Sequence, residues 1–525
     1  MDRQILSSSW VEPVGFVRPA TIELSALDNL TASVYPTPTK FFPLMPEADP
    51  IQLYDDCKRG LARYLYQCPI FCGKIIKHET GRMSVDIPPA PYAGAKFEYY
   101  DHRNDKEIPS YDEFRSFGWP FADGNKDGLK KLCPDNFPTT ETGDPVIIPR
   151  FNVIRGGIVL MMSATHATGD LVQFIDFMKN WAAHTRSVSN ARLSNQPEPP
   201  APEQVAAHLM DRSPMMPNVP NEPDLDKVAS RAENIPHWTM LDPRDPEKMG
   251  DTLQTLFTTA RLTDHDLVNY TEGALREPSV SVWVFPKSSV ESLRDMAQKA
   301  SAGLSKLSIV DCLTAFTWQC FFVAKWAPGQ SGQQTVPDMS RIVYLGSVRS
   351  RLASPLPLDY MPACVDVFTV DVETRVFASL SPESLAKTAA NIRDSNRNWD
   401  ERRFCDMLEV AQMHPMNPGI VPEGPLDALA TDHTRLSAAV LENWGPGLGQ
   451  CEAFREPYLG RVPPPGEITL LPRCNNGDIG VMFAGEAAVL ERLRDNEDLN
   501  AMASCQFIMH DFAKMASKCR KASKL

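Results

Sequence analysis

An apolar run meets an abrupt polar turn between Gly156 and Asp170, which read GGIVLMMSATHATGD. The continuous Ile, Val, Leu and Met residues favour a buried strand, which we expect to span 153–164. From Leu171 the apolar spacing changes to the helical period. A buried strand that leads through a short turn into an amphipathic helix is typical of a layered α/β protein. The apolar helical positions are Leu171, Phe174, Ile175, Met178 and Trp181.

His166 and Asp170 stand in the turn between this strand and this helix. A histidine at the end of a strand projects into the cleft that the edge of the sheet faces, where it can act as a general base. Taken alone, such a histidine is more often a hydrogen-bonded structural residue. Asp170 occupies the N-cap position, where its carboxylate accepts backbone N–H groups of the first helical turn. The local pattern leaves a structural and a catalytic interpretation open.

The rest of the chain mixes strands and helices without regular alternation. Helical spacing occurs at 51–66, 309–324 and 486–496, and a strand pattern at 341–348. The run 469–483 has Asn-Gly at its middle and predicts a hairpin. The sequence has no G-x-G-x-x-G or Walker motif. We therefore expect an α/β protein with mixed sheets and helical layers rather than a doubly wound nucleotide-binding fold.

A proline-rich segment divides the chain. Residues 197–223 carry prolines too densely for a helix or a central strand, which predicts an extended crossover. We expect an N-terminal domain at 1–196, a crossover linker at 197–250 and a C-terminal domain at 251–522. The polar stretch 101–144 predicts a long loop with short local structure.

Composition and charge exclude several classes of function. The chain of 525 residues has a net charge of −13, which argues against a nucleic-acid partner but permits a local cationic cluster for an anionic co-substrate. Its twelve cysteines form no C-x-x-C pair, and no cluster with histidine indicates a metal site. We expect reduced thiols, no secretory signal, no membrane span and a monomer.

The last three residues are Ser523, Lys524 and Leu525. A terminal Ser-Lys-Leu is the address that the peroxisomal import receptor reads. The alternative is a basic tail that ends this way by chance. We expect a peroxisomal protein that binds the import receptor, and a cytoplasmic one if the address is not read.

Motifs along nearly the whole chain resemble those of the BAHD acyltransferases, relatives of chloramphenicol acetyltransferase, and they occur in the family's order. His166 to Asp170 is similar to the His-x-x-x-Asp signature, and the glycine-rich element at 443–449 is closest to fungal members. Each match is modest, but the shared order is strong evidence. The other matching segments are Leu24–Asp28, Pro69–Lys74, Gly156-Gly157, Asp211–Ser213, and Arg349–Arg351 with Pro355, Pro357 and Tyr360.

The resemblance implies two chloramphenicol-acetyltransferase-like domains that meet along a tunnel. Acyl-CoA, a co-substrate, would enter one mouth, and a small-molecule acceptor with a hydroxyl or amine would enter the other. His166 would remove the acceptor's proton as it attacks the thioester, with no covalent acyl-enzyme, no permanently bound cofactor and no metal. Asp170 would pair with Arg349 or Arg351 and brace the turn. The acceptor would be a secondary metabolite or glycolipid.

The glycine-rich element also departs from the family pattern. Asn443, followed by Trp444 and Gly445, replaces the family's Asp, so an ion pair there would become a hydrogen bond; we expect all three to be structural. His433 stands about where relatives have Trp, which makes it a candidate substrate contact.

Three rival interpretations remain. A carnitine-type acyltransferase would need a Ser-Thr-Ser segment, which the chain lacks. A condensation domain would need a histidine at Thr165. A non-catalytic binding protein of the same fold is favoured by Asn443 and opposed by the intact His166.

Overall fold

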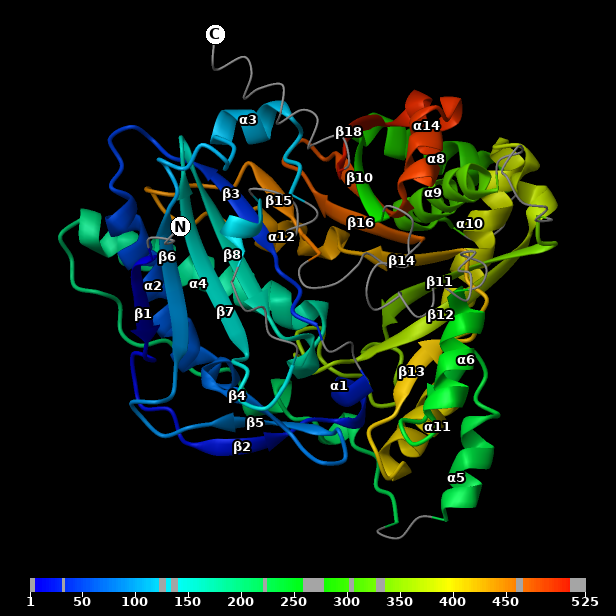
Figure 1. The fold of residues 1–525 in the computed structure, drawn as a ribbon, viewed down its shortest axis with the longest axis horizontal. Coiled ribbons are helices and arrows are strands. Elements are labelled where there is room, and N and C mark those ends of the chain that lie inside the picture. Colours follow the sequence, from blue (N-terminus) through cyan, green and yellow to red (C-terminus); the bar gives the residue numbers. More distant parts are fainter. Residues whose placement is uncertain are drawn as a thin grey trace.

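A computed structural model of the chain has two halves that lie side by side, each built on one large mixed sheet (Figure 1). The elements that follow are placed within the residues that the structure describes. These are 5–30, 34–121, 129–133, 140–220, 224–257, 278–301, 306–326, 336–458 and 466–509.

The sheet of the N-terminal half has six strands in the order β1-β6-β7-β8-β3-β15. Only β6 and β7 are parallel, and the other neighbours are antiparallel. Residues 453–455, which the predicted boundaries assign to the C-terminal domain, form the edge strand β15 of this first sheet. The strands are β1 (Ile5–Val11), β6 (Ala95–Asp101), β7 (Ile147–Ile154), β8 (Gly157–Ala164), β3 (Thr39–Pro43) and β15 (Ala453–Arg455).

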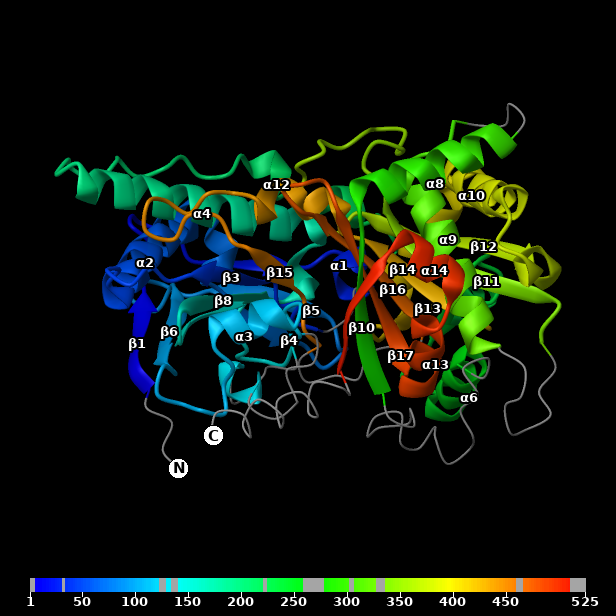
Figure 2. The same ribbon diagram turned by 90° about the horizontal axis from the view of Figure 1, so that it is seen from above.

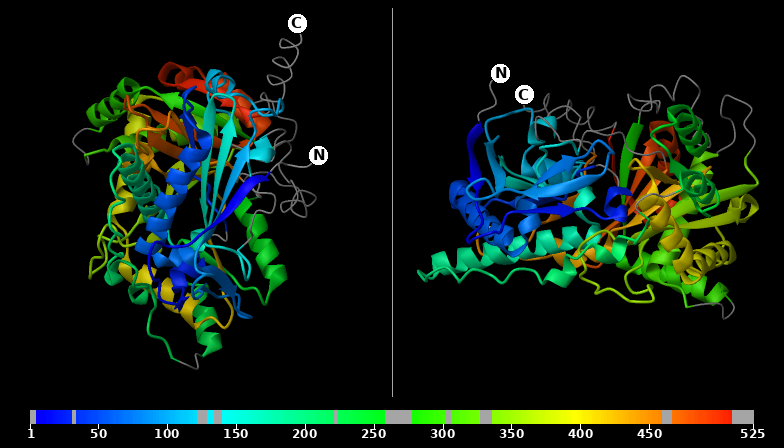
Figure 3. Two further views of the ribbon diagram at one scale, coloured as in Figure 1. Left: turned by 90° about the vertical axis from the view of Figure 1, so that its left-hand side faces the viewer. Right: turned by 90° about the horizontal axis from the view of Figure 1, so that it is seen from below.

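Two long helices cover one face of the first sheet. They are α2 (Pro50–Gln67) and α4 (Leu171–Leu193), and α4 runs from the boundary between the halves along the N-terminal half (Figure 3). Trp181 is fully buried between them, and its indole N–H donates to the carbonyl oxygen of Cys57 at 2.8 Å. The short helix α3 (Tyr111–Ser116) lies on the opposite face of the sheet (Figure 2).

The sheet of the C-terminal half has seven strands in the order β12-β11-β14-β16-β17-β10-β18. The internal strand β14 runs parallel to both neighbours, and the remaining pairs are antiparallel. This sheet is therefore mixed, like the first. The strands are β12 (Val365–Glu373), β11 (Met339–Ser347), β14 (Ala428–Asp432), β16 (Glu467–Arg473), β17 (Ile479–Glu486), β10 (Pro278–Phe285) and β18 (Ser504–Ile508).

Helices pack against one face of the second sheet through a separate apolar core. The helix α9 is almost entirely buried, and the side chain of Trp318 is fully enclosed. These helices are α8 (Lys287–Ala300), α9 (Ile309–Lys325), α10 (Pro382–Arg397), α13 (Ala487–Arg494) and α14 (Glu497–Met502).

The other faces of the two sheets meet in a shared apolar cluster. Phe41 and Met161 of the first sheet pack there with Val282, Leu471 and Met482 of the second. Alternate residues of a strand share one face, so the residues two positions along continue each face beyond the cluster.

On the facing sides of both sheets, the strand positions just beyond the apolar cluster carry hydroxyl side chains. Ser163 follows Met161 on β8, and Thr469 precedes Leu471 on β16; both are buried. Thr431 lies beside Thr469 in the parallel pair of β14 and β16. The faces that the two sheets turn toward each other therefore change from apolar to hydroxyl side chains along these strands.

Small elements complete the fold. A three-stranded antiparallel sheet of β2 (Ala20–Glu23), β5 (Met83–Ile87) and β4 (Lys74–Lys77) lies beside α1 (Ala26–Leu30) (Figure 1). The crossover carries more structure than an extended linker, because α5, β9 and α6 occur within 197–257. The other elements are α5 (Leu225–Ala232), β9 (Trp238–Leu241), α6 (Pro246–Phe257), α11 (Glu401–Met413), β13 (Gly419–Pro422) and α12 (Ser437–Val440).

The strand expected at 153–164 is wrong at its beginning. The chain turns at Arg155 and Gly156, so Val153 and Ile154 end β7 and β8 begins at Gly157. Gly156 has a φ of +76°, a conformation that favours glycine, which explains the turn. The expected helices at 51–66 and 309–324 and the hairpin at 469–483 are confirmed, with ends shifted by a few residues.

None of the helices in the described part of the chain is long and apolar enough to cross a membrane.

A half-buried carboxylate on α4 makes stability depend on pH. Asp176 accepts hydrogen bonds from the Tyr64 hydroxyl at 2.8 Å and from the Asn180 amide at 2.6 Å. Burial nevertheless raises its pKa to about 6. Because the folded pKa is higher than the unfolded one, Asp176 contributes stability that is full below pH 4 and is lost as the pH rises through 6.

We expect Asp176→Asn to stabilise the protein above pH 6 by about 2 kcal/mol, because the amide carries no charge to bury. The gain should shrink toward zero at pH 3. Thermal unfolding of both proteins between pH 3 and 8 measures it. Asp112→Asn is the matched control, because the Asp112 side chain is 88% exposed. A gain that does not change with pH would contradict the assignment of the titration to Asp176.

Candidate active site

His166 lies at the junction of β8 and α4. From Gly157 to Asp170 every residue is buried except His166, which is partly exposed. Its backbone N–H donates to the carbonyl oxygen of Val34 at 2.9 Å. Its ring meets the ring of Phe174 edge-on, with centroids 6.1 Å apart. The backbone is thus fixed, while the imidazole is the accessible side chain of this strand and turn.

Local hydrogen bonds shape the turn that carries His166. The Thr165 hydroxyl oxygen accepts the backbone N–H of Ala167 at 3.3 Å, and the Gln173 amide donates to the Thr168 hydroxyl at 2.7 Å. A Cβ atom at Gly169 would lie 2.5 Å from the carbonyl oxygen of Met361. Glycine is therefore needed here for close packing.

Asp170 caps α4 and forms a buried ion pair. Its carboxylate accepts the backbone N–H of Val172 at 3.0 Å, as expected for an N-cap. Arg349 approaches in bidentate fashion, with Nη1 and Nη2 at 2.8 and 2.9 Å from the two carboxylate oxygens. Both side chains are at most 3% exposed. The pair joins the His166 turn to the end of β11, in the other half of the molecule.

Of the two arginines considered for Asp170, the structure selects Arg349. Arg351 instead donates to the side chain of Asn396 at 2.8 Å and stacks over Phe368 at 4.9 Å. Burial lowers the pKa of Arg351. Arg351 therefore braces α10 against β12 and does not contact Asp170.

The glycine-rich element packs against α4. The side chain of Asn443 accepts the backbone N–H of Gly445 at 2.7 Å, which stabilises a turn. Trp444 is 1% exposed and meets Trp181 edge-on at 5.3 Å. Arg186 of α4 pairs with the adjacent Glu442 and donates to the backbone carbonyl oxygen of Asn443 at 2.6 Å.

His433 follows β14 and lies close to the carboxylate of Glu456, 2.6 Å from its Nδ1. Burial disfavours the charged imidazole, but Glu456 and the nearby Asp432 and Glu467 raise the pKa of His433 above its ordinary value. Glu456 directly follows β15, so the pair links the edge of the first sheet to the second. A substrate contact of His433 stays a prediction.

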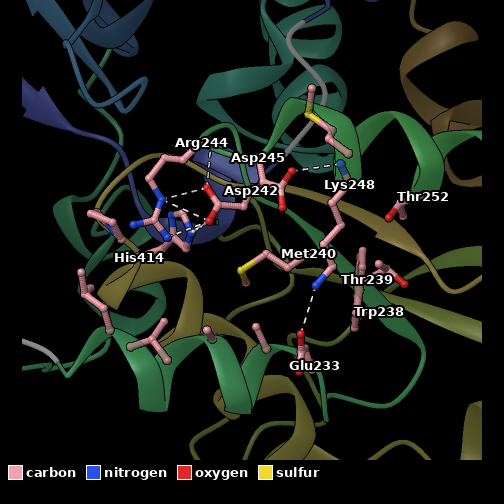
Figure 4. A pocket seen from close by; sticks show the side chains of 16 residues that line it. Glu233, Trp238, Thr239, Met240, Asp242, Arg244, Asp245, Lys248, Thr252 and His414 are labelled. Carbon is pink, nitrogen blue, oxygen red and sulfur yellow. Dashed lines mark hydrogen bonds and ion pairs between the residues drawn. The ribbon is translucent and has the colours of Figure 1, made fainter.

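A cavity of about 290 Å³ lies away from this site, between α5, β9, α6 and the end of α11 (Figure 4). Its charged groups engage one another. Lys248 pairs with Glu233 at 3.0 Å, and Asp242 pairs with Arg244 at 2.7 Å and with His414 at 3.3 Å. His166 is not among its lining residues.

The sequence did not predict two acidic residues of this region: Glu442, which pairs with Arg186, and Glu456, which lies beside His433. Glu442 is adjacent to the departure at Asn443, and that proximity was the available signal. Glu456 is 23 residues from His433, and no local pattern connects them.

Ser523, Lys524 and Leu525 lie outside the described residues. Among the described residues, no group of three or more His, Cys, Asp or Glu side chains is arranged to hold a metal ion.

Comparison with known proteins shows which family the chain matches. The model of the Transferase family matches residues 4–417. Acyltransferase M4 of Phoma sp. is 23% identical over 524 residues, covering 96% of this chain and 99% of that protein. Trichothecene 3-O-acetyltransferase TRI101 of Fusarium sporotrichioides is 23% identical over 486 residues, covering 86% and 90%.

Solved structures share the fold. The structure of F. sporotrichioides TRI101 complexed with coenzyme A and T-2 superimposes with a TM-score of 0.68 at 17% identity, covering 93% of this chain and all of that one. Vinorine synthase superimposes with a TM-score of 0.61 at 15% identity, covering 95% and 98%. The expected architecture of two halves, each built on a mixed sheet with helical layers, is confirmed at this level.

The chain belongs to the Transferase family, and its motifs place it with the BAHD-type acyltransferases. This confirms the membership predicted from the His-x-x-x-Asp signature and the motifs around it, and with it the class of enzyme.

Proposed function

We propose that this chain transfers an acyl group from acyl-CoA to a hydroxyl group of a small secondary metabolite, with His166 as general base. The observation that carries the proposal is the partial exposure of His166 within an otherwise buried strand and turn. Within this strand and turn, the imidazole of His166 is the side chain that a substrate can reach. The bidentate pair of Asp170 and Arg349 keeps Asp170 away from chemistry and in a bracing role.

The reaction balances without a covalent intermediate on the enzyme. A neutral imidazole of His166 takes the proton of the acceptor hydroxyl while the oxygen attacks the thioester carbonyl carbon. The C–S bond of the tetrahedral intermediate then breaks. The sulfur leaves as CoA thiol with the proton from His166, and the new ester remains on the acceptor. Proton transfer by a positioned base is typically worth about two to four orders of magnitude in rate.

The space between the two sheets is the proposed meeting place of the substrates. Ser163 and the turn that carries His166 belong to the same end of β8, and Thr431 and Thr469 continue the facing side of the second sheet. Hydroxyl side chains at these positions suit an acceptor with several oxygen atoms, because a hydroxyl group can both donate and accept a hydrogen bond. The Ser163 hydroxyl is also bonded to the Thr37 hydroxyl at 2.9 Å. The apolar cluster between the two sheets lies at the other end of these strands.

Relatives support the choice of donor and acceptor. TRI101 is a trichothecene 3-O-acetyltransferase, and its structure holds coenzyme A with T-2. We extend from it only the reaction class, O-acylation of an oxygen-rich metabolite by acyl-CoA. An amine acceptor would use the same base and the same proton transfer.

A CoA-release assay tests the proposal. Acetyl-, butyryl-, hexanoyl- and octanoyl-CoA are combined with a panel of hydroxylated metabolites that includes deoxynivalenol, and free thiol is measured. We expect acceptor-dependent thiol release and an ester product by mass spectrometry. Binding of CoA and of an acceptor with no release across the panel would favour a non-catalytic member of the fold.

Location bears on the donor. If Ser523-Lys524-Leu525 is read by the import receptor, the enzyme lies where fatty acyl-CoAs are shortened, and short- and medium-chain thioesters are available there. Each methylene buried in an apolar groove contributes about 0.8 kcal/mol, so a few methylenes give strong selectivity.

We therefore expect specificity constants to rise from acetyl-CoA to a longer acyl-CoA. A steady fall from acetyl-CoA onward would leave an acetyltransferase. Fluorescent fusions with and without the last three residues test the location separately, and the intact fusion should be peroxisomal. Identical cytosolic signals from both fusions would remove the targeting proposal.

A further inference from the structure

A second buried ion pair lies behind the His166 turn. Arg212, in the crossover, places its Nε 3.0 Å from the carboxylate of Asp28, in α1. The side chains are 4% and 0% exposed. A buried pair of this kind needs further hydrogen bonds to offset the desolvation of both charges. The acceptors of the other Arg212 hydrogen bonds show which segments of the chain the ion pair connects.

Arg212 reaches the backbone of the His166 turn directly. Its Nη2 donates to the carbonyl oxygen of Thr168 at 2.9 Å, two residues beyond His166. Its Nη1 donates to the carbonyl oxygen of Met210 at 3.2 Å. One planar guanidinium therefore joins the crossover, the carboxylate of Asp28 and the turn in a fixed geometry, which an ammonium group cannot reproduce.

The two ion pairs share one dipeptide. Asp28 accepts the backbone N–H of Ala363 at 2.9 Å, and Asp170 accepts the backbone N–H of Cys364 at 3.0 Å. Neighbouring amides are thus held by two different carboxylates, each paired with its own arginine. The His166 turn is held at Asp170 by Arg349 and at Thr168 by Arg212.

We infer that Arg212, held by Asp28, is a positioning residue for His166, and that the crossover thereby sets the geometry of the general base. This inference rests on the proposed role of His166. Asp170 and Arg349 fix the helix end of the turn, but the carbonyl of Thr168 lies closer along the chain to His166. Without Arg212 the peptide after Thr168 loses a charge-assisted hydrogen bond. A base displaced by about 1 Å can cost about 100-fold in rate.

The test compares Arg212→Ala and Arg212→Lys with the wild type. We expect kcat to fall by about tenfold to hundredfold while KM for the acyl-CoA changes by less than about twofold, because Arg212 is 4% exposed and its N–H groups are engaged by the protein. Guanidinium chloride at millimolar concentration should restore part of the kcat of Arg212→Ala. Arg231→Ala is the matched control, because Arg231 is 40% exposed and pairs with Asp406 on the protein surface. The control should keep wild-type kcat and show no rescue.

A second readout needs no acceptor. Carbethoxylation of His166 by diethyl pyrocarbonate, followed by peptide mass spectrometry, should change in rate in both Arg212 variants, while the exposed His208 reacts as in the wild type. His166→Ala is assayed in parallel. If His166→Ala keeps wild-type turnover, the proposed function fails. If His166→Ala is inactive but both Arg212 variants keep wild-type kcat and carbethoxylation rate, only the positioning role fails.

Discussion

Replacement of His166 by alanine is expected to lower the rate of acyl transfer by about two to four orders of magnitude. The variant should fold normally, because the imidazole is partly exposed and the backbone of the turn is held by Val34, Asp170 and Thr165. The affinity for acyl-CoA should change little, since a general base acts on the acceptor's proton rather than on the thioester carrier. The measurement is kcat by thiol release together with the dissociation constant of CoA.

His208→Ala is the control for the loss of a histidine, since His208 lies exposed in the crossover. It should keep full activity. Near-normal turnover of His166→Ala with the natural acceptor would show that another group removes the proton.

Removal of the carboxylate in Asp170→Ala is expected to destabilise the fold by about 3–5 kcal/mol. Arg349 would remain 1% exposed without its counter-ion, and the N-cap of α4 would be lost as well. Activity should fall in the same variant, because the turn that carries His166 loses its tie to β11. Thermal unfolding and thiol release measure the two effects on the same sample.

Asp371→Ala provides the comparison. Asp371 pairs with Arg341 at 2.7 Å, but its side chain is 40% exposed, so its loss should cost less than about 1 kcal/mol. An Asp170→Ala variant that is as stable as the wild type yet inactive would point to a direct chemical role for Asp170 and against the bracing role.

The local sequence was sufficient for the elements that carry the site. The apolar run before His166 predicted a buried strand, and the change of period at Leu171 predicted α4. Asp170 was identified as the N-cap from its position alone, and the structure confirms that bond. These features follow from the spacing of residues within about twenty positions, where chain geometry fixes which side chains share a face.

The edges of elements were harder to predict. Val153 and Ile154 are as apolar as the residues after Gly157, so the hairpin turn between β7 and β8 was hidden in one continuous pattern. The edge strand β15 is three residues long and comes from far along the chain. Its pairing depends on the free edge of β3, which no property of residues 453–455 reveals.

The sequence by itself determined the strand, the helix, the cap at Asp170 and, through the order of its motifs, the family. Only the tertiary structure decided which charges meet. It selected Arg349 over Arg351 for Asp170, paired Glu442 with Arg186, and joined Arg212 to Asp28. The physical reason is that a buried charge requires a partner within a few ångströms, whatever the separation along the chain. Asp170 and Arg349 are 179 residues apart, and Asp28 and Arg212 are 184 apart. Packing of the two sheets and the crossover brings them together.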